Sequence, residues 1–161
     1  MTIAIGEKLP DINLQHKAAN GIVNVDKVTL LANKRVIIFA VPGAFTPTCS
    51  DKHLPSFIRN IDNLKACGIA TIACLAVNDP FVMYAWGEVQ CINEKIMMLA
   101  DGSAEFTKKI GMEIDLTDLG LGIRSQRYAM VLNDGVVTHL FIDPMGSYQV
   151  SSAENVLKHL N

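Results

Sequence analysis

The chain lacks several features that often reveal a function. Its 161 residues carry 14 Lys and Arg against 16 Asp and Glu, without a basic cluster, so nothing indicates a nucleic-acid partner. No apolar run is long enough to cross a membrane, and the N-terminus has neither the basic start nor the apolar core of a signal peptide. We therefore expect an unprocessed cytoplasmic protein that binds neither membranes nor nucleic acid.

The cysteines also lack a familiar spacing. No pair of them forms a Cys-x-x-Cys motif, which argues against a zinc knuckle and a thioredoxin-type dithiol. Cys49 and His53 lie one helical turn apart, but two ligands are too few for a metal site and no third is apparent. We expect no bound metal, and in a reducing compartment most of the cysteines should be free thiols. The four are Cys49, Cys67, Cys74 and Cys91.

What the chain does have is a regular succession of strand and helix patterns. Residues 35–41 (RVIIFAV) and 69–77 (IATIACLAV) are continuous apolar runs of the kind that form buried strands. Between them, apolar residues recur on one face of a helix that should end near Gly68. Asp79 and Pro80 are expected to cap and begin a second helix that ends at residue 89.

The C-terminal half predicts a loop, a hairpin and a last helix. Residues 115–126 are punctuated by glycines and are expected to be a loop. Asp134-Gly135 stands between two strand-like runs and is a strong hairpin signal. The remaining expected elements are a short strand over 96–99, a short helix over 103–110, hairpin strands over 127–132 and 136–142, and a helix over 153–160 capped by Ser151 or Ser152.

This order of elements predicts the fold class. A strand, a crossover helix and a second parallel strand give a right-handed unit, and the hairpin adds antiparallel strands. We expect an α/β protein with a thioredoxin-like fold, in which helices flank a mixed central sheet. The absence of a linker or repeat indicates a single domain over residues 1–161.

Cys49 is the reactive candidate because of its place in this fold. The segment VPGAFTPTCS (residues 41–50) leaves the carboxyl end of a buried strand, where ligand sites of open α/β sheets gather. Cys49 follows at the start of a helix, where unpaired N–H groups stabilise a thiolate. The Thr46 hydroxyl can turn back toward the sulfur, while Pro42 and Pro47 restrict the loop and shield it from water.

These residues alone leave three functional classes open. The first is a thiol enzyme that uses Cys49. The second is a redox sensor or holdase in which the same cysteine is oxidised once without turnover. The third is a hydrolase in which His53 acts as the general base for Cys49, although such a base usually comes from a distant segment. An inert cysteine after an ordinary helix entry, with Thr48 as N-cap, is the simplest alternative to all three.

The same segment resembles the active-site loop of the peroxiredoxins. Their pattern P-x-x-x-T/S-x-x-C falls on Pro42, Thr46 and Cys49, and the continuation into His53-Leu54-Pro55 is similar to the peroxiredoxin 5, or type II, group. The resemblance covers nearly the whole chain in the right order. Three further matching stretches are VNDPFVMYAW (77–86), LADGSAEFTKKIG (99–111) and GLGIRSQRYAMVLNDGVV (120–137).

The resemblance implies an antioxidant thiol peroxidase that needs no cofactor. Cys49 takes the place of the peroxidatic cysteine, and Thr46 and Pro42 those of the loop residues. The family arginine that points at the sulfur falls on Arg127, which we favour over the neighbouring Arg124 because strand parity turns it toward the loop. Hydrogen peroxide and organic hydroperoxides are the implied substrates.

The resemblance leaves the reductant and the assembly to be decided. The C-terminal region carries no second cysteine, which closes one route used by some members. Cys74 is a candidate second cysteine, but a mid-strand thiol is more often part of the core. We therefore expect an external thiol to reduce Cys49, with glutathione and glutaredoxin favoured over thioredoxin. A homodimer is implied by the family, and Phe45, Phe81 and Trp86 either line its interface or pack in the core.

Overall fold

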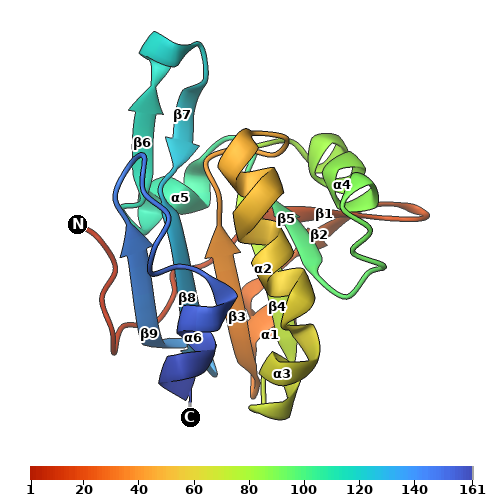
Figure 1. Ribbon diagram of the computed structural model, residues 1–161, viewed down its shortest axis with the longest axis vertical. Coiled ribbons are helices and arrows are strands. Elements are labelled where there is room, and N and C mark those ends of the chain that lie inside the picture. The colour runs from red at the N-terminus through yellow and green to blue at the C-terminus, as the bar shows by residue number, and fades with distance from the viewer. Residues whose placement is uncertain (161) are drawn as a thin grey trace.

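The computed structural model describes residues 1–160 and is built around a seven-stranded sheet (Figure 1). The strands are β1 (Leu14–Ala18), β2 (Gly21–Val25), β3 (Arg35–Ala40), β4 (Thr71–Ala76), β5 (Met97–Ala100), β6 (Glu113–Leu116), β7 (Gly122–Ser125), β8 (Arg127–Asn133) and β9 (Val136–Asp143). The α-helices are α1 (Lys27–Leu31), α2 (Leu54–Arg59), α3 (Ile61–Ala66), α4 (Pro80–Val89), α5 (Glu105–Lys109) and α6 (Ala153–Leu160). A π-helical turn over Cys49–His53 precedes α2, and a 3₁₀ turn over Thr117–Leu119 joins β6 to β7.

The sheet is mixed, with the strand order β2-β1-β5-β4-β3-β8-β9. The central strands β3, β4 and β5 are parallel, whereas β1, β8 and β9 pair antiparallel to their neighbours. With helices on both faces, this arrangement confirms the predicted α/β, thioredoxin-like fold. β6 and β7 pair with each other in a separate two-stranded ribbon (residues 113–125), which projects from the body in Figure 1.

Each face of the sheet has its own apolar core, which explains the continuous apolar runs. Along β3, Ile37 and Phe39 face one side, where they pack in a cluster with residues of α2, α3, α4 and α6. Val36 and Ile38 face the other side and pack in a cluster with residues of α1 and α5. A strand buried on both faces loses the alternation of a half-exposed strand, so these runs are apolar at every position.

Local signals predicted the ends of several elements correctly. The Asp79 carboxylate accepts the Val82 N–H at 2.9 Å, which caps α4 as expected. Asp134 and Gly135 have φ values of 49° and 80°, the left-handed conformation that a tight hairpin turn between β8 and β9 requires. At the start of α6, Ser152 is the residue whose hydroxyl accepts a helix N–H, from Asn155.

Three parts of the fold differ from the sequence prediction. The predicted loop over 115–126 instead contains the end of β6 and all of β7, because the ribbon strands are only four residues each and their mostly half-buried positions carry little apolar pattern. β1 and β2 form a hairpin that was not predicted, since four of the five β2 positions are exposed. The helix predicted after Cys49 begins with the π-helical turn and is interrupted at Asn60, whose N–H bonds back to Phe57.

Among residues 1–160, no helix is both long and apolar enough to cross a membrane.

Candidate active site

Cys49 opens the π-helical turn that follows β3 and the active-site loop (residues 41–48). Its side chain is 1% exposed and belongs to the core cluster on the α2 side of the sheet. The turn is held against α4, because the Trp86 indole N–H donates to the Ser50 hydroxyl and the Gln90 amide donates to the Ser50 carbonyl. π-helical turns are rare and often occur at functional sites, so the position of Cys49 in this turn is consistent with a functional role.

Arg127 brings a cation to the sulfur from the neighbouring strand. It is the first residue of β8, and the β3–β8 register pairs Ala40 with Tyr128, so Arg127 lies beside the start of the active-site loop. Its Nη2 lies 3.3 Å from the Cys49 Sγ. Arg127 as a whole is 8% exposed, and water therefore screens its charge little.

Arg124, the alternative arginine, contacts the loop but not the sulfur. Its Nε donates to the Leu121 carbonyl at 2.9 Å, and its Nη1 donates to the Pro42 carbonyl at 3.2 Å. A Cβ on Gly43 would lie 2.5 Å from that Nη1, so any larger residue there would displace the guanidinium from its present position. Arg124 thus braces the active-site loop from the ribbon, whereas Arg127 reaches the thiol.

His53 is buried beside Arg127, with both ring nitrogens engaged. Nε2 lies 3.0 Å from the Ser151 carbonyl, and Nδ1 lies 3.0 Å from Arg127 Nη1. Because a carbonyl only accepts and a guanidinium only donates, the proton belongs on Nε2 and the ring is neutral. Burial, and then the charge of Arg127, lowers the pKa of His53 to about 3. This arrangement does not suit the hydrolase hypothesis, because neither nitrogen is left to take a proton from Cys49.

The buried neutral state of His53 predicts a pH-dependent stability. Its pKa is 6.5 in an unfolded chain and about 3 in the folded protein, so between these values only the unfolded state binds the proton. The free energy of unfolding should therefore be highest above pH 6.5 and fall by about 1.4 kcal/mol per pH unit as the pH decreases below that value.

Urea unfolding of the wild type and of His53→Gln, at several pH values down to about 4.5, measures this slope. The variant cannot titrate, and its amide can still donate to the Ser151 carbonyl, so its stability should depend less on pH. Equal slopes for the two proteins would show that His53 does not change protonation on unfolding.

Three other residues of the active-site loop, Thr46, Thr48 and Phe45, have side chains whose hydrogen bonding or exposure the structure defines. The Thr46 hydroxyl donates to the Gly43 carbonyl at 2.6 Å, so its proton is turned away from the sulfur and only its lone pairs are left to a ligand. Thr48 makes no side-chain cap, contrary to the alternative reading of the helix entry. Phe45 is 52% exposed at a φ of 65°, a conformation that is rare for a bulky residue.

Cys74 lies in the middle of β4 and is fully buried in the same core cluster as Cys49. Burial, and then the proximity of Cys49, raises the pKa of the Cys74 thiol well above its usual range. A thiol in this state is a poor nucleophile. Its environment is that of a core residue.

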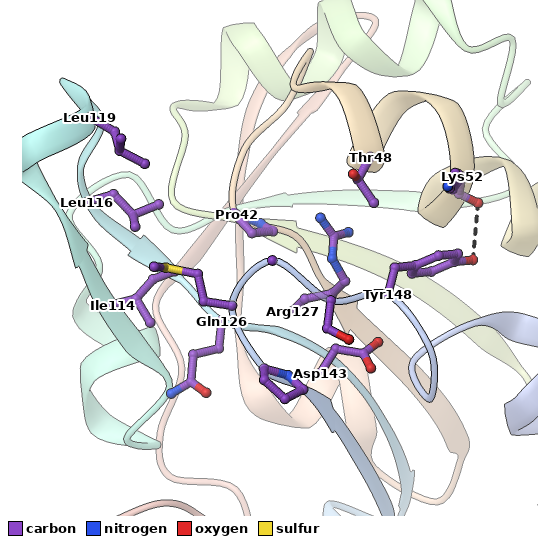
Figure 2. Close-up of a pocket in the computed structure, with 14 residues that line it drawn as sticks. Pro42, Thr48, Lys52, Ile114, Leu116, Leu119, Gln126, Arg127, Asp143 and Tyr148 are labelled. Atoms are coloured by element: carbon purple, nitrogen blue, oxygen red, sulfur yellow. Dashed lines mark hydrogen bonds between the residues drawn. The ribbon is translucent and has the colours of Figure 1, made fainter.

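A cavity of about 570 Å³ opens next to Arg127 (Figure 2). Figure 2 shows Ile114, Leu116 and Leu119 reaching toward it from the ribbon, opposite Arg127 and Tyr148. Its lining is therefore apolar on the ribbon side and charged at the end near the thiol. The full lining is Pro42, Thr48, Lys52, Ile114, Leu116, Leu119, Gln126, Arg127, Asp143, Pro144, Met145, Gly146, Ser147 and Tyr148.

Part of this wall was missed by the sequence reading. Residues 144–151, here called the C-terminal strap, connect β9 to α6 and carry Tyr148, whose ring centroid lies 5.8 Å from the Arg127 Cζ. Asp143 anchors the strap through its carboxylate. The only sequence signal was an Asp-Pro pair followed closely by Gly146, which is typical of any turn.

The fold and this site define a class of protein: a thioredoxin-like α/β protein in which a buried cysteine contacts an arginine at the carboxyl end of a central strand. A family model described as Redoxin matches residues 4–157. Peroxiredoxin-2E, a chloroplastic protein of Arabidopsis thaliana, is 48% identical over an alignment of 163 positions that covers 99% of this chain and 70% of that protein. Peroxiredoxin-2B of the same plant is 46% identical over 159 residues and 98% of each chain.

Solved structures agree with these relatives. The crystal structure of reduced Prx3 from Vibrio vulnificus in complex with H₂O₂ matches with a TM-score of 0.95 and 50% identity, over 99% of this chain and 100% of that one. Peroxiredoxin 5 from Alvinella pompejana matches with a TM-score of 0.84 and 33% identity, over 98% and 97% of the two chains. The chain belongs to the peroxiredoxin family, in its peroxiredoxin 5 or type II group, and is a peroxiredoxin-type peroxidase.

Proposed function

We propose that this protein reduces hydrogen peroxide and organic hydroperoxides by oxidising Cys49 to a sulfenic acid, which an external thiol then reduces. The observation that carries the proposal is the 3.3 Å contact between the Cys49 Sγ and Nη2 of Arg127, a residue that lines the charged end of the cavity. The H₂O₂ bound in the Vibrio vulnificus relative supports the choice of substrate.

In the first step the Cys49 thiolate attacks one peroxide oxygen in line with the O–O bond. A sulfur–oxygen bond forms, the O–O bond breaks, and its electron pair leaves on the second oxygen, which takes a proton from solvent to become water or an alcohol. The sulfur is oxidised and the peroxide is reduced. Negative charge moves from sulfur to the leaving oxygen, so a fixed cation that contacts both stabilises the transition state.

Arg127 is the proposed cation, with Thr46 and Pro42 as its partners in the loop. Because the Thr46 hydroxyl already donates to Gly43, it can only accept, and we assign it the proton of the hydroperoxide O–H. Pro42 lines the cavity and restricts the backbone before Thr46. His53 acts by holding Arg127, and Phe45 is an exposed residue of the same loop.

The cavity supports organic hydroperoxides as substrates. Ile114, Leu116 and Leu119 give it an apolar wall beside the charged end, which suits a peroxide oxygen at Arg127 and a hydrocarbon substituent against the ribbon. Hydrogen peroxide needs only the charged end.

For the reductive step we propose an external thiol, with glutathione and glutaredoxin favoured and thioredoxin as the alternative. A thiolate attacks the sulfenic sulfur, a sulfur–sulfur bond forms, and the hydroxyl leaves as hydroxide, which takes a proton from solvent to become water. A second thiolate then attacks the other sulfur of this mixed disulfide and releases Cys49 as the thiolate. The buried Cys74, whose pKa is raised, supports this route over an internal disulfide.

The one-cysteine route makes a prediction about Cys74. Cys74→Ala should leave turnover with an external thiol within about twofold of wild type, because Ala also suits a small buried apolar position. Intact-mass analysis of the peroxide-treated wild type should show added oxygen. A loss of two hydrogens that disappears in Cys74→Ala would instead identify a Cys49–Cys74 disulfide.

We also propose a homodimer, with residues 1–161 of each copy acting as one domain. Phe45 in the active-site loop and Phe81 in the first turn of α4 support it, because they are 52% and 62% exposed. The two segments are adjacent, since the Ala44 N–H donates to the Asn78 side chain just before α4. Trp86 is fully buried and packs in the core. A cytoplasmic location stays a prediction, since the relatives include a chloroplastic protein.

Stopped-flow assays of peroxide consumption test the proposal. The wild type is mixed with hydrogen peroxide or cumene hydroperoxide, and the donor is varied between glutathione with glutaredoxin and thioredoxin. Continuous turnover with at least one donor is the expected result. A single equivalent of peroxide consumed, with no turnover on any donor, would favour the sensor or holdase class.

A further inference from the structure

The C-terminal strap is tied down by one buried carboxylate. Asp143 ends β9 and is 1% exposed, directly opposite Arg127 in the β8–β9 register. Its Oδ1 accepts the N–H groups of Gln149 and Val150 at 3.0 and 2.9 Å. Its Oδ2 accepts the Ser151 N–H at 3.1 Å and the Ser151 hydroxyl at 2.6 Å. Four donors from the strap thus converge on a carboxylate that sits next to the catalytic arginine.

These hydrogen bonds fix the position of the Ser151 carbonyl, which is the hydrogen-bond partner of His53 Nε2. Ser151 is held at both its N–H and its hydroxyl, and its carbonyl accepts the His53 Nε2–H at 3.0 Å. The ring proton is therefore confined to Nε2, and Nδ1 presents a lone pair to Arg127 Nη1. The neighbouring Nη2 of the same guanidinium contacts the Cys49 sulfur.

Tyr148, which also belongs to the strap, packs against His53 and binds the π-helical turn. Its ring lies 5.4 Å from the His53 ring, and its hydroxyl donates to the Lys52 carbonyl in the π-helical turn at 3.3 Å. Phe39 and Phe57 enclose His53 from the core side, with ring centroids 5.1 and 5.7 Å away. The imidazole is therefore packed between these three aromatic rings and hydrogen-bonded at both nitrogens, and it has little freedom to rotate.

We propose that Asp143 is a positioning residue, which fixes the tautomer of His53 through the strap and thereby aims Arg127 at Cys49. The inference rests on the proposed peroxidase function. If the Ser151 carbonyl moved away, the proton could shift to Nδ1, where an N–H would face the guanidinium N–H groups. Two donors cannot bond to each other, so Arg127 would turn away from the sulfur.

Asp143→Asn tests this chain of contacts. One amide oxygen can still accept, but the amide NH₂ faces N–H donors of the strap, so the strap should loosen. We expect kcat/KM for hydrogen peroxide to fall about 10-fold to 100-fold, the size of effect produced by a small misplacement of a catalytic group. The value of kcat/KM for the thiol donor should stay within about twofold, because reduction of the sulfenic acid does not need the peroxide-aligned arginine. A merely structural defect would reduce the active fraction and lower both values alike.

The pH profile gives a second readout. The charged and titratable groups around His53 are Arg127 on β8, Asp143 on β9, Tyr148 on the strap and Cys49 in its own turn. In the wild type His53 stays neutral, because its pKa is about 3. Asp143→Asn removes a charge that raises this pKa, but burial is the largest cause of the shift and the Asp143 charge the smallest. Water that reaches the ring through the loosened strap should therefore outweigh the lost charge and return the pKa toward 6.5, so the peroxide rate should gain a new decline below about pH 6.5.

Two further variants keep the proposal falsifiable. Ser151→Ala removes one of the four donors and leaves the Ser151 backbone, so a smaller loss in the same direction is expected even if Asp143→Asn folds poorly. Asp26→Asn is the matched control, since Asp26 caps the remote helix α1 and Asn caps equally well. Wild-type peroxide rates and pH profile in folded Asp143→Asn and Ser151→Ala would overturn the proposal. Absence of turnover in the wild type would instead overturn the proposed function.

Discussion

Cys49→Ser is expected to abolish peroxidase turnover, with a loss in kcat/KM on the order of 10³-fold or more. The reason is the nucleophile: the thiolate attacks the peroxide oxygen, whereas a serine hydroxyl near neutral pH is neither ionised nor easily oxidised. The substitution is nearly isosteric, and the hydroxyl can still accept from Arg127 Nη2. The fold and the cavity should therefore survive while the chemistry stops.

Stopped-flow peroxide consumption with an external thiol measures this loss, and circular dichroism checks that the variant is folded. Cys91→Ser is the matched control, because Cys91 is exposed after the end of α4 and should tolerate the same change with wild-type turnover. Undiminished activity in Cys49→Ser would contradict the assignment of the nucleophile. A complete loss in both variants would point to a general effect of removing a thiol.

The parts of the site that are contiguous in sequence could be predicted. Pro42, Thr46 and Cys49 lie within eight residues, and a strand that ends before a proline followed by a helical pattern places them at the carboxyl edge of the sheet. Asp79 was a reliable cap for the same reason, since an N-cap bonds to a residue only three positions away. Such features depend on residues that are close together in the sequence, so they can be recognised from the sequence alone.

The parts that depend on contacts between distant segments could not be derived in the same way. Arg124 and Arg127 are three residues apart, and what separates their roles is the β3–β8 register and the path of the ribbon. His53 was considered as a base because it follows Cys49 by one turn. Its actual partners, Arg127 and Ser151, lie 74 and 98 residues away. Only the folded chain shows that both of its nitrogens are used.

The π-helical turn over Cys49–His53 and the ribbon were missed for different reasons. A π turn adds one residue to a helical turn, and an apolar periodicity measured over a whole helix does not reveal such a local change. The ribbon strands are four residues each and mostly half-buried, so they carry no strong apolar alternation. Both features nevertheless shape the site, since the turn sets the place of Cys49 and the ribbon supplies one wall of the cavity.

Arg127→Met should lower kcat/KM for hydrogen peroxide by about 10²-fold to 10³-fold, the usual cost of removing one preorganised donor from a developing negative charge. Methionine keeps much of the length and apolar stem of the side chain but removes the contacts to Cys49 and His53. Arg127→Lys should recover only part of the loss, because one ammonium group cannot reproduce the planar fork that contacts both partners.

Substitutions of two other arginines, Arg59 and Arg124, test whether the loss of activity in Arg127→Met is due to the position of Arg127 rather than to the loss of a positive charge. Arg59 pairs with Glu154 at 2.9 Å on the exposed surface, so Arg59→Met removes the same charge and should stay within about twofold of wild type. Arg124→Met removes two bonds to carbonyls, of about 1 kcal/mol each, and should cost less than the loss at Arg127. If Arg124→Met proved the more damaging variant in peroxide kinetics, the transition-state cation would have to be reassigned to Arg124, and the contact between Arg127 and the sulfur would be structural only.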